Sequence, residues 1–154
     1  MVIREIGLLL YGMPIFYQPY NKASRDESSL ITRSAFISSI LGFAEKLISP
    51  VDYFESEKYV FVFQKDFILS RRTKDKELLI AYTILDKEKR VEKSIKNRIL
   101  PLLEEVLKKF ISKFSGKDLN ETTQFLSFKE ELDKIVGTDT KSLDEKVSSM
   151  FFGK

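Results

Sequence analysis

The stretch Ser28–Ile48, SSLITRSAFISSILGFAEKLI, decides the fold because it predicts one long helix with apolar residues on two faces. One stripe recurs at spacings of three, four and seven residues and consists of Leu30, Ile37, Leu41, Ala44 and Ile48. A second stripe, displaced by about a third of a turn of the ~3.6-residue helical period, consists of Phe36, Ile40, Phe43 and Leu47. The first stripe predicts packing on a sheet. The second predicts a surface that binds a partner, or one that the C-terminal helix or tail covers.

Two strands are predicted before this helix. In Ile3–Tyr11, three apolar residues (Ile6, Leu8, Leu10) alternate with a mixed set (Glu5, Gly7, Leu9), so one face of the strand is apolar and the other is mixed. Gly12-Met13 is a short turn, and the second strand is Pro14–Tyr20. Because Pro19 lacks a backbone donor, this second strand is expected at or near the edge of the sheet.

Three more strands are predicted after the helix, which Ser49-Pro50 ends. Their ranges are Val51–Glu55, Lys58–Lys65 and Leu78–Leu85. Both faces of Lys58–Lys65 are apolar, which favours a central or covered strand, and Leu78–Leu85 is apolar throughout, which indicates burial on both faces. The charged stretch Arg71–Glu77 predicts an exposed loop between them.

The remaining sequence predicts helices. Asp86 is a candidate cap for a helix that extends to about Phe114, and Pro101 either kinks this helix or restarts it. Ser115-Gly116 ends it. A further helix is expected over Thr123–Val136, closed by Gly137. Its apolar set is Phe125, Leu126, Phe128, Leu132, Ile135 and Val136.

The predicted order is therefore strand, strand, helix, strand, strand, strand, helix, helix. This order favours an α+β fold with one five-stranded antiparallel sheet, the first helix on one face and the C-terminal helices on the other. Residues 1–136 are expected to form a single domain. Residues 137–154 are expected to form a tail that is a short helix or disordered, and its Phe151-Phe152 pair either folds back on the first helix or stays free.

The composition argues against an enzyme. The chain has no Cys and no His, so thiol nucleophiles, Ser–His triads and thiolate or imidazole metal sites are excluded. The densest carboxylate cluster, Glu130, Glu131 and Asp133, lies beside lysines on a predicted amphipathic helix, which is typical of a surface. Neither the phosphate-binding loop nor the dinucleotide fingerprint occurs. We expect no catalysis, no cofactor and no metal.

Positive charge is concentrated between residues 87 and 117, where 10 basic and 4 acidic side chains give a net +6. Lys89, Lys93 and Lys96 are candidates for contact with an anionic lipid or phosphate surface. The alternative is a solvated helix face, because Glu88 and Glu92 interleave with the lysines. No apolar run reaches the ~20 residues of a membrane helix, and the start of the chain lacks the basic leader and cleavage site of a signal peptide. We expect a cytoplasmic protein with at most peripheral membrane contact and no binding of nucleic acid.

Several of these features together resemble a longin domain of the SNARE-like superfamily. The chain begins on a strand, and Gly12-Met13-Pro14-Ile15-Phe16 resembles the hairpin G-x-P-[IL]-[FY] of that family. The helix SAFISSILGFAEKL resembles its first helix, rich in small residues, and Glu57-Lys58-Tyr59-Val60-Phe61 resembles its turn into a strand with an aromatic run. The resemblance covers roughly Ile3–Phe114 and is nearest to free-standing archaeal longin-like proteins.

The resemblance implies a binding platform. Longin domains regulate membrane-traffic proteins, bind short helices or extended peptides, pair with one another, and in several complexes engage a small GTPase. It therefore implies a non-catalytic module that forms a homodimer or pairs with a longin or roadblock-like subunit and engages a small GTPase or a vesicle-trafficking partner. The expected partner-binding residues are Phe36, Ile40, Phe43 and Leu47. The alternative is a ligand-sensing domain of the PAS or GAF kind that holds a small molecule in an internal pocket lined by Phe and Tyr.

Overall fold

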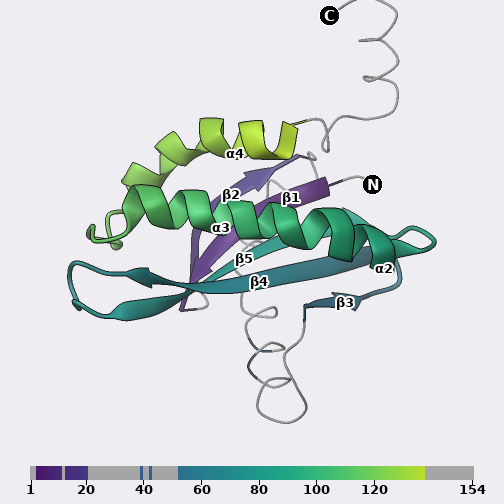
Figure 1. Ribbon diagram of the computed structural model, residues 1–154, viewed down its shortest axis with the longest axis horizontal. Helices are drawn as coiled ribbons and strands as arrows, with labels where there is room; N and C mark the ends of the chain where they lie inside the picture. The colour runs from purple at the N-terminus through teal and green to yellow at the C-terminus, as the bar shows by residue number, and fades with distance from the viewer. Residues whose placement is uncertain (1–2, 12, 21–38, 40–41, 43–51, 138–154) are drawn as a thin grey trace, which may run out of the picture.

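The computed structural model describes residues 3–11, 13–20, 39, 42 and 52–137 of the chain. Five strands are followed by a run of helical segments (Figure 1). The strands are β1 (Ile3–Leu10), β2 (Met13–Pro19), β3 (Tyr53–Glu55), β4 (Tyr59–Leu69) and β5 (Lys76–Asp86). The helical segments are α2 (Val91–Ser94), the π-helical turn η2 (Ile95–Ile99), α3 (Leu100–Phe114), the 3₁₀ helix η3 (Thr122–Phe128) and α4 (Lys129–Val136).

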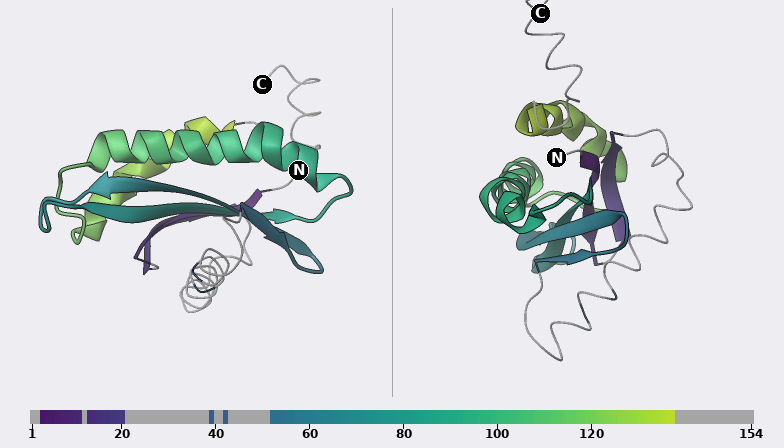
Figure 2. Two further views of the ribbon diagram at one scale, coloured as in Figure 1. Left: turned by 60° about the horizontal axis from the view of Figure 1, so that its bottom comes forward. Right: turned by 90° about the vertical axis from the view of Figure 1, so that its right-hand side faces the viewer.

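The predicted five-stranded antiparallel sheet is confirmed. Its strand order is β2-β1-β5-β4-β3, and each neighbouring pair is antiparallel. The described helical segments lie together over one face of the sheet (Figure 2). As predicted, β2 is an edge strand and β5 is almost completely buried. The predicted helix Ser28–Ile48 lies outside the described residues except for Ser39 and Gly42, which are helical and exposed.

The hairpin formed by β4 and β5 is longer than predicted. β4 continues to Leu69 and β5 begins at Lys76, so Leu69 pairs with Lys76 and the connection between the strands consists of residues 70–75. The turn closes because Lys74 adopts a left-handed conformation (φ 57°) and its N–H donates to the Ser70 carbonyl at 2.9 Å. Sequence reasoning ended β4 too early because apolar alternation stops at Lys65, where the strand becomes exposed.

The helical region differs from the prediction at three points. The predicted helix Thr123–Val136 is a 3₁₀ helix up to Phe128 and becomes α-helical at Lys129. Asp86 is not a helix cap: the helix begins at Val91 after Arg90 in a left-handed conformation, with no side-chain cap. Before Pro101 the chain forms the π-helical turn η2, and α3 then begins with the proline in its first turn. This corresponds to the restart alternative, because a proline in the first turn needs no backbone donor. The predicted ends at Ser115-Gly116 and Gly137 are confirmed.

The main core lies between the sheet and the helical segments. Its centre is a group of phenylalanine rings, at most 8% exposed, whose neighbouring centroids lie 4.7–6.2 Å apart. These rings, here called the Phe cluster, are Phe16, Phe110, Phe114, Phe125 and Phe128. The cluster joins β2, α3 and η3, so it fixes the position of η3 relative to the edge of the sheet.

The opposite face of the sheet carries a second, smaller core. Its buried members are Leu9, Phe63, Ile80, Tyr82 and Ile84. Inside it the Tyr82 hydroxyl donates a 2.7 Å hydrogen bond to the Glu5 carboxylate, and Glu5 is only 1% exposed. Gly7 provides the room for this tyrosine, because a Cβ at Gly7 would lie 2.4 Å from a ring carbon of Tyr82.

Candidate functional site

An apolar groove runs between the edge strand β2 and the 3₁₀ helix η3. Its volume is about 480 Å³, and we call it the β2–η3 groove. Ten residues line it: Pro14, Ile15, Phe16, Tyr17, Gln18, Thr122, Thr123, Phe125, Leu126 and Lys129. Lys129 is the single charged residue among them, so the groove has the chemistry of a surface for apolar side chains.

The wall of the groove on β2 is an irregular strand. Leu8 pairs with Phe16 and Leu9 pairs with Pro14, so Ile15 is an extra residue in β2. Such bulges increase the local twist of a strand and change the direction of its side chains. Pro19 lies near the other end of β2, and Tyr20 closes the pairing by donating its N–H to the Arg4 carbonyl at 2.8 Å.

The floor of the groove is rigid because it belongs to the Phe cluster. Phe125 is fully buried, and its ring centroid lies 5.1 Å from that of Phe110 and 5.0 Å from that of Phe114. Phe16 packs edge-on against Phe128 with a centroid distance of 5.6 Å. A ligand would therefore meet a preformed surface, which reduces the ordering cost of binding.

The outer rim carries the most exposed large apolar side chain in the described part of the molecule. Leu126 is 72% exposed, although both Phe125 and Phe128 are buried. In a 3₁₀ helix, residues three apart lie on the same side, so Phe125 and Phe128 point inward together while Leu126 points outward. Met13, which precedes the groove residue Pro14, is also 61% exposed. Exposed apolar side chains beside an apolar groove are typical of an interaction site.

Hydrogen bonds hold the loop that leads into η3. The Gln124 side-chain amide donates to the Asp118 carbonyl at 2.6 Å and to the Glu121 carbonyl at 2.8 Å. The Thr123 hydroxyl donates to the Glu121 carboxylate at 2.9 Å. The groove residues Thr122 and Thr123 are therefore fixed by local contacts as well as by the Phe cluster.

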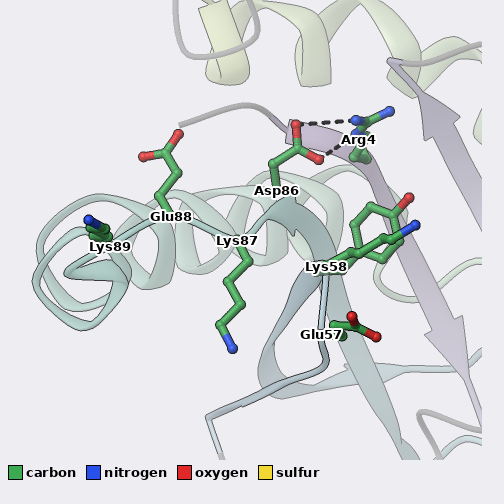
Figure 3. A pocket seen from close by; sticks show the side chains of 8 residues that line it. Arg4, Glu57, Lys58, Asp86, Lys87, Glu88 and Lys89 are labelled. Atoms are coloured by element: carbon green, nitrogen blue, oxygen red, sulfur yellow. Dashed lines mark hydrogen bonds and ion pairs between the residues drawn. The ribbon is translucent and has the colours of Figure 1, made fainter.

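A second hollow, of about 570 Å³, lies where β1, β4 and the chain after β5 meet (Figure 3). Its central contact is an ion pair: the Arg4 guanidinium donates to the two Asp86 carboxylate oxygens at 2.7 and 3.3 Å. The hydrogen bond to Asp86 raises the pKa of Arg4. Lys87, Glu88 and Lys89 point in different directions around this pair (Figure 3). Because the charges diverge and alternate in sign, they do not form one anion-binding pocket.

The residues predicted for anionic contact are exposed, but Lys89 lies outside the helical run that holds Lys93 and Lys96. Lys89 lies in the connection before α2 and lines the Arg4–Asp86 hollow. Lys93 lies in α2 and lines a neighbouring hollow with Glu55 and Glu92, and Lys96 is exposed in η2. Lys89 is therefore not part of the predicted basic helix, since Arg90 adopts a left-handed conformation before Val91. Contact of the three lysines with an anionic surface stays a prediction.

The predicted partner-binding residues Phe36, Ile40, Phe43 and Leu47 lie outside the described residues. The β2–η3 groove was not predicted from sequence. One available signal was Leu126, which follows the buried Phe125 directly and so falls off a regular helical stripe. The other signal was the pair of prolines in the predicted edge strand.

Two of the three carboxylates considered for catalysis make contacts within the fold. Asp133 accepts a 3.0 Å hydrogen bond from the Tyr20 hydroxyl, and Glu131 lies 3.7 Å from the Lys113 ammonium. Glu130 is exposed. Within residues 3–11, 13–20 and 52–137, no three carboxylates gather where they could hold a metal ion.

Comparisons with known proteins give no family for this chain. No protein-family model matches the sequence, and no curated protein sequence matches it. Among the helices of the described residues, none has the length and apolar character needed to cross a membrane.

Proposed function

We propose that this protein is a non-catalytic interaction module of the longin kind that binds a protein partner through the β2–η3 groove. The observation that carries the proposal is the exposed Leu126 on the rim of an apolar groove whose floor is fixed by the Phe cluster. Burying apolar area contributes roughly 25 cal/mol per Å², so an accessible apolar groove is a favourable binding surface. The polar fringe of Gln18, Thr122 and Thr123 can orient what binds there.

The resemblance to longin domains suggests which partners to test. A five-stranded antiparallel sheet followed by a run of helical segments is compatible with that resemblance. On this proposal the protein pairs with itself or with a related longin or roadblock-like subunit. It then engages a small GTPase or a membrane-trafficking partner, in the cytoplasm or at the periphery of a membrane. The second stripe of the predicted helix Ser28–Ile48 is a further proposed contact.

The proposal predicts nucleotide-dependent binding that requires Leu126. The immobilised protein is incubated with lysate of its source organism in the presence of GDP or a non-hydrolysable GTP analogue. We expect a small GTPase to be retained in one nucleotide state and to be lost, by tenfold or more, with Leu126→Asp. An exposed Leu126 contributes little to folding, so this variant should remain folded.

The matched control is Phe67→Asp, which also places a carboxylate on an exposed apolar position, 56% exposed, but in β4. Equal loss of binding in both variants would indicate nonspecific adhesion to apolar surface and would refute a specific groove. Retention of only the same chain or longin relatives would favour a structural pairing subunit.

A small-molecule sensor of the PAS or GAF kind is the second candidate. The groove volume of about 480 Å³ falls within the range of ~300–1,000 Å³ that is usual for ligand pockets. Against it, the phenylalanines that were expected to line an internal pocket pack on one another in the Phe cluster. A metabolite that raises the melting temperature of the protein, but not that of Leu126→Asp, would favour the sensor.

A further inference from the structure

The β4–β5 hairpin ends in a turn that lies at the end of the sheet farthest from α2 (Figure 1). Residues 65–78, here called the hairpin tip, separate acidic from apolar side chains between the two faces of the sheet. Ile68 belongs to the main core, so its partner Glu77 and the nearby Asp66 also lie on the face under the helical segments. Phe67 alternates with Ile68 and therefore lies on the opposite face.

The face of the hairpin tip that carries Phe67 is apolar and basic. Phe67 is 56% exposed, and Leu69, two residues further along the same face, is 43% exposed. Leu78, which pairs with Phe67, is partly buried. Two exposed lysines flank these side chains on the same face, since Lys65 precedes Phe67 by two residues and Lys76 pairs with Leu69. Positive charge therefore borders an exposed apolar patch.

The turn adds more positive charge beside this patch. Arg71, Arg72 and Lys74 are exposed in it. None of the ion pairs formed among the described residues involves these three side chains. The acidic residue of the turn, Asp75, accepts the backbone N–H of Lys76 at 2.8 Å. The basic groups of the turn are thus available to an anionic surface.

Backbone hydrogen bonds to the loop after α3 hold the hairpin tip in place. The Gly116 N–H donates to the Leu69 carbonyl at 2.8 Å, and the Arg71 N–H donates to the Lys117 carbonyl at 3.1 Å. A surface that meets the hairpin tip therefore meets a preformed arrangement, which reduces the ordering cost of binding.

We infer that the hairpin tip docks on an anionic lipid surface, with Phe67 and Leu69 entering the interface and the basic side chains of the turn contacting the lipid head groups. This contact goes beyond the proposed function, because it does not involve the β2–η3 groove. It also places the membrane contact at the end of the sheet away from the lysines that the sequence suggested.

The size and chemistry of the hairpin tip favour a lipid surface over a protein partner. A stable protein interface buries roughly 800 Å² on each side and uses roughly 20–30 residues of each partner, which is more than this segment offers. A bilayer can receive a narrow tip, because apolar side chains enter the interface while long basic side chains extend to the head groups. The two attractions act together, and each is weak alone.

The first test measures binding of the full chain to vesicles. Sucrose-loaded vesicles of equal parts phosphatidylcholine and phosphatidylglycerol are sedimented with the protein, and vesicles of phosphatidylcholine alone give the uncharged comparison. A basic side chain near an anionic surface strengthens binding roughly fivefold, so Arg71→Gln combined with Arg72→Gln should weaken it roughly 25-fold. The matched control, Lys108→Gln with Lys109→Gln, removes the same charge from exposed positions in α3 and should have little effect.

A fluorescent reporter locates the contact. The chain contains no tryptophan, so Phe67→Trp introduces a single one at the hairpin tip. Its emission should shift to shorter wavelength when the mixed vesicles are added, because indole side chains partition into the membrane interface. Tyr59→Trp, at the other end of β4, is the matched reporter and should show no shift. All these substitutions are at exposed positions, so the urea midpoint of each variant should match that of the unchanged chain.

Four outcomes would overturn the inference. The chain does not sediment with the mixed vesicles, or both glutamine pairs weaken binding equally, which would indicate attraction by net charge alone. Equal shifts of the two tryptophan reporters would indicate adsorption without a defined contact. Finally, a loss caused by Lys93→Gln with Lys96→Gln in place of the arginine pair would assign the anionic contact to the predicted lysines.

A crossed experiment separates this inference from the proposed function. Phe67→Asp should weaken vesicle binding tenfold or more and should still retain the small GTPase from lysate cleared of membranes, whereas Leu126→Asp should do the reverse. If vesicle binding fails while Leu126→Asp still abolishes partner binding, the groove is an interaction site and only the lipid contact inferred here is wrong.

Discussion

The two faces of the sheet are built by different means. On the face under the helical segments, the Phe cluster fills the space between layers, and its rings contact one another edge-on or tilted. On the opposite face the central contact is polar and lies within the sheet: Tyr82 occupies the space above Gly7 and donates to the buried Glu5. Packing on the first face requires apolar groups that fill the right volume, whereas packing on the second face requires the specific residues Glu5, Gly7 and Tyr82.

This difference bears on where a binding site can lie. The helical face ends at the β2–η3 groove, where the Phe cluster supports an exposed rim. No described helix lies over the opposite face, yet Leu9, Phe63 and Tyr82 are at most 1% exposed. Coverage of that face by the predicted helix Ser28–Ile48 stays a prediction, supported by the positions of β2 and β3 at opposite edges of the sheet.

The largest effect is expected in the Phe cluster. Phe128→Ala removes a fully buried ring that contacts Phe16, Phe110 and Phe114. The lost burial and the remaining cavity should lower the free energy of unfolding by about 3–5 kcal/mol. Urea unfolding followed by circular dichroism measures this change.

The control is Leu126→Ala, two residues away in the same 3₁₀ helix, which should cost at most about 0.5 kcal/mol because this side chain is exposed. Similar losses for the two variants would mean that the phenylalanine rings do not form the rigid floor on which the groove depends.

A smaller loss of stability is expected on the opposite face of the sheet, where Gly7→Ala adds a methyl group to a filled space. In Gly7→Ala the new methyl group would lie 2.4 Å from a carbon of the Tyr82 ring, which is fully buried. Overpacking of this kind costs about 1–3 kcal/mol. The same unfolding measurement applies.

A double-mutant cycle tests the cause. Tyr82→Leu removes the atoms in conflict, so Gly7→Ala should cost much less in that background than in the unchanged chain. If the cost is the same in both backgrounds, strand geometry rather than contact with Tyr82 explains the glycine.

Sequence patterns predict most of the strands and helices, but they do not predict the buried contact between Glu5 and Tyr82. Strands and helices follow from periodicity, so β5 and α3 were found nearly at their observed positions. From sequence alone, Glu5 and Gly7 are members of a mixed strand face, because a single sequence does not show which distant residue will lie opposite them. The register β1–β5, which sets Gly7 against Tyr82, is a property of the folded sheet.

The candidate site was harder to predict than the fold. The groove joins β2 and η3, which are more than a hundred residues apart in the chain, and no local pattern relates them. Ser39 and Gly42 are the residues of the predicted helix that the structure describes, and both are helical and exposed. The two apolar stripes of this helix stay predictions.

The smallest effect is expected at the hydrogen bond from the Tyr20 hydroxyl to Asp133, which joins the edge of the sheet to α4. Burial, followed by the negative charge of Asp133, raises the pKa of Tyr20 above its usual value. Above about pH 10 the folded state therefore holds a proton that the unfolded state releases, so this contribution is complete below pH 10 and declines as the pH rises further. Tyr20→Phe should lower the free energy of unfolding by about 0.5–1.5 kcal/mol at pH 7 and should make it less sensitive to pH above 10.

The measurement compares the free energy of unfolding of the unchanged chain and of Tyr20→Phe as a function of pH. The raised pKa values of Tyr11 and Tyr53 act in the same direction in both chains, so the difference between the two curves isolates Tyr20. Parallel curves across this range would show that the hydroxyl does not hold α4 to β2.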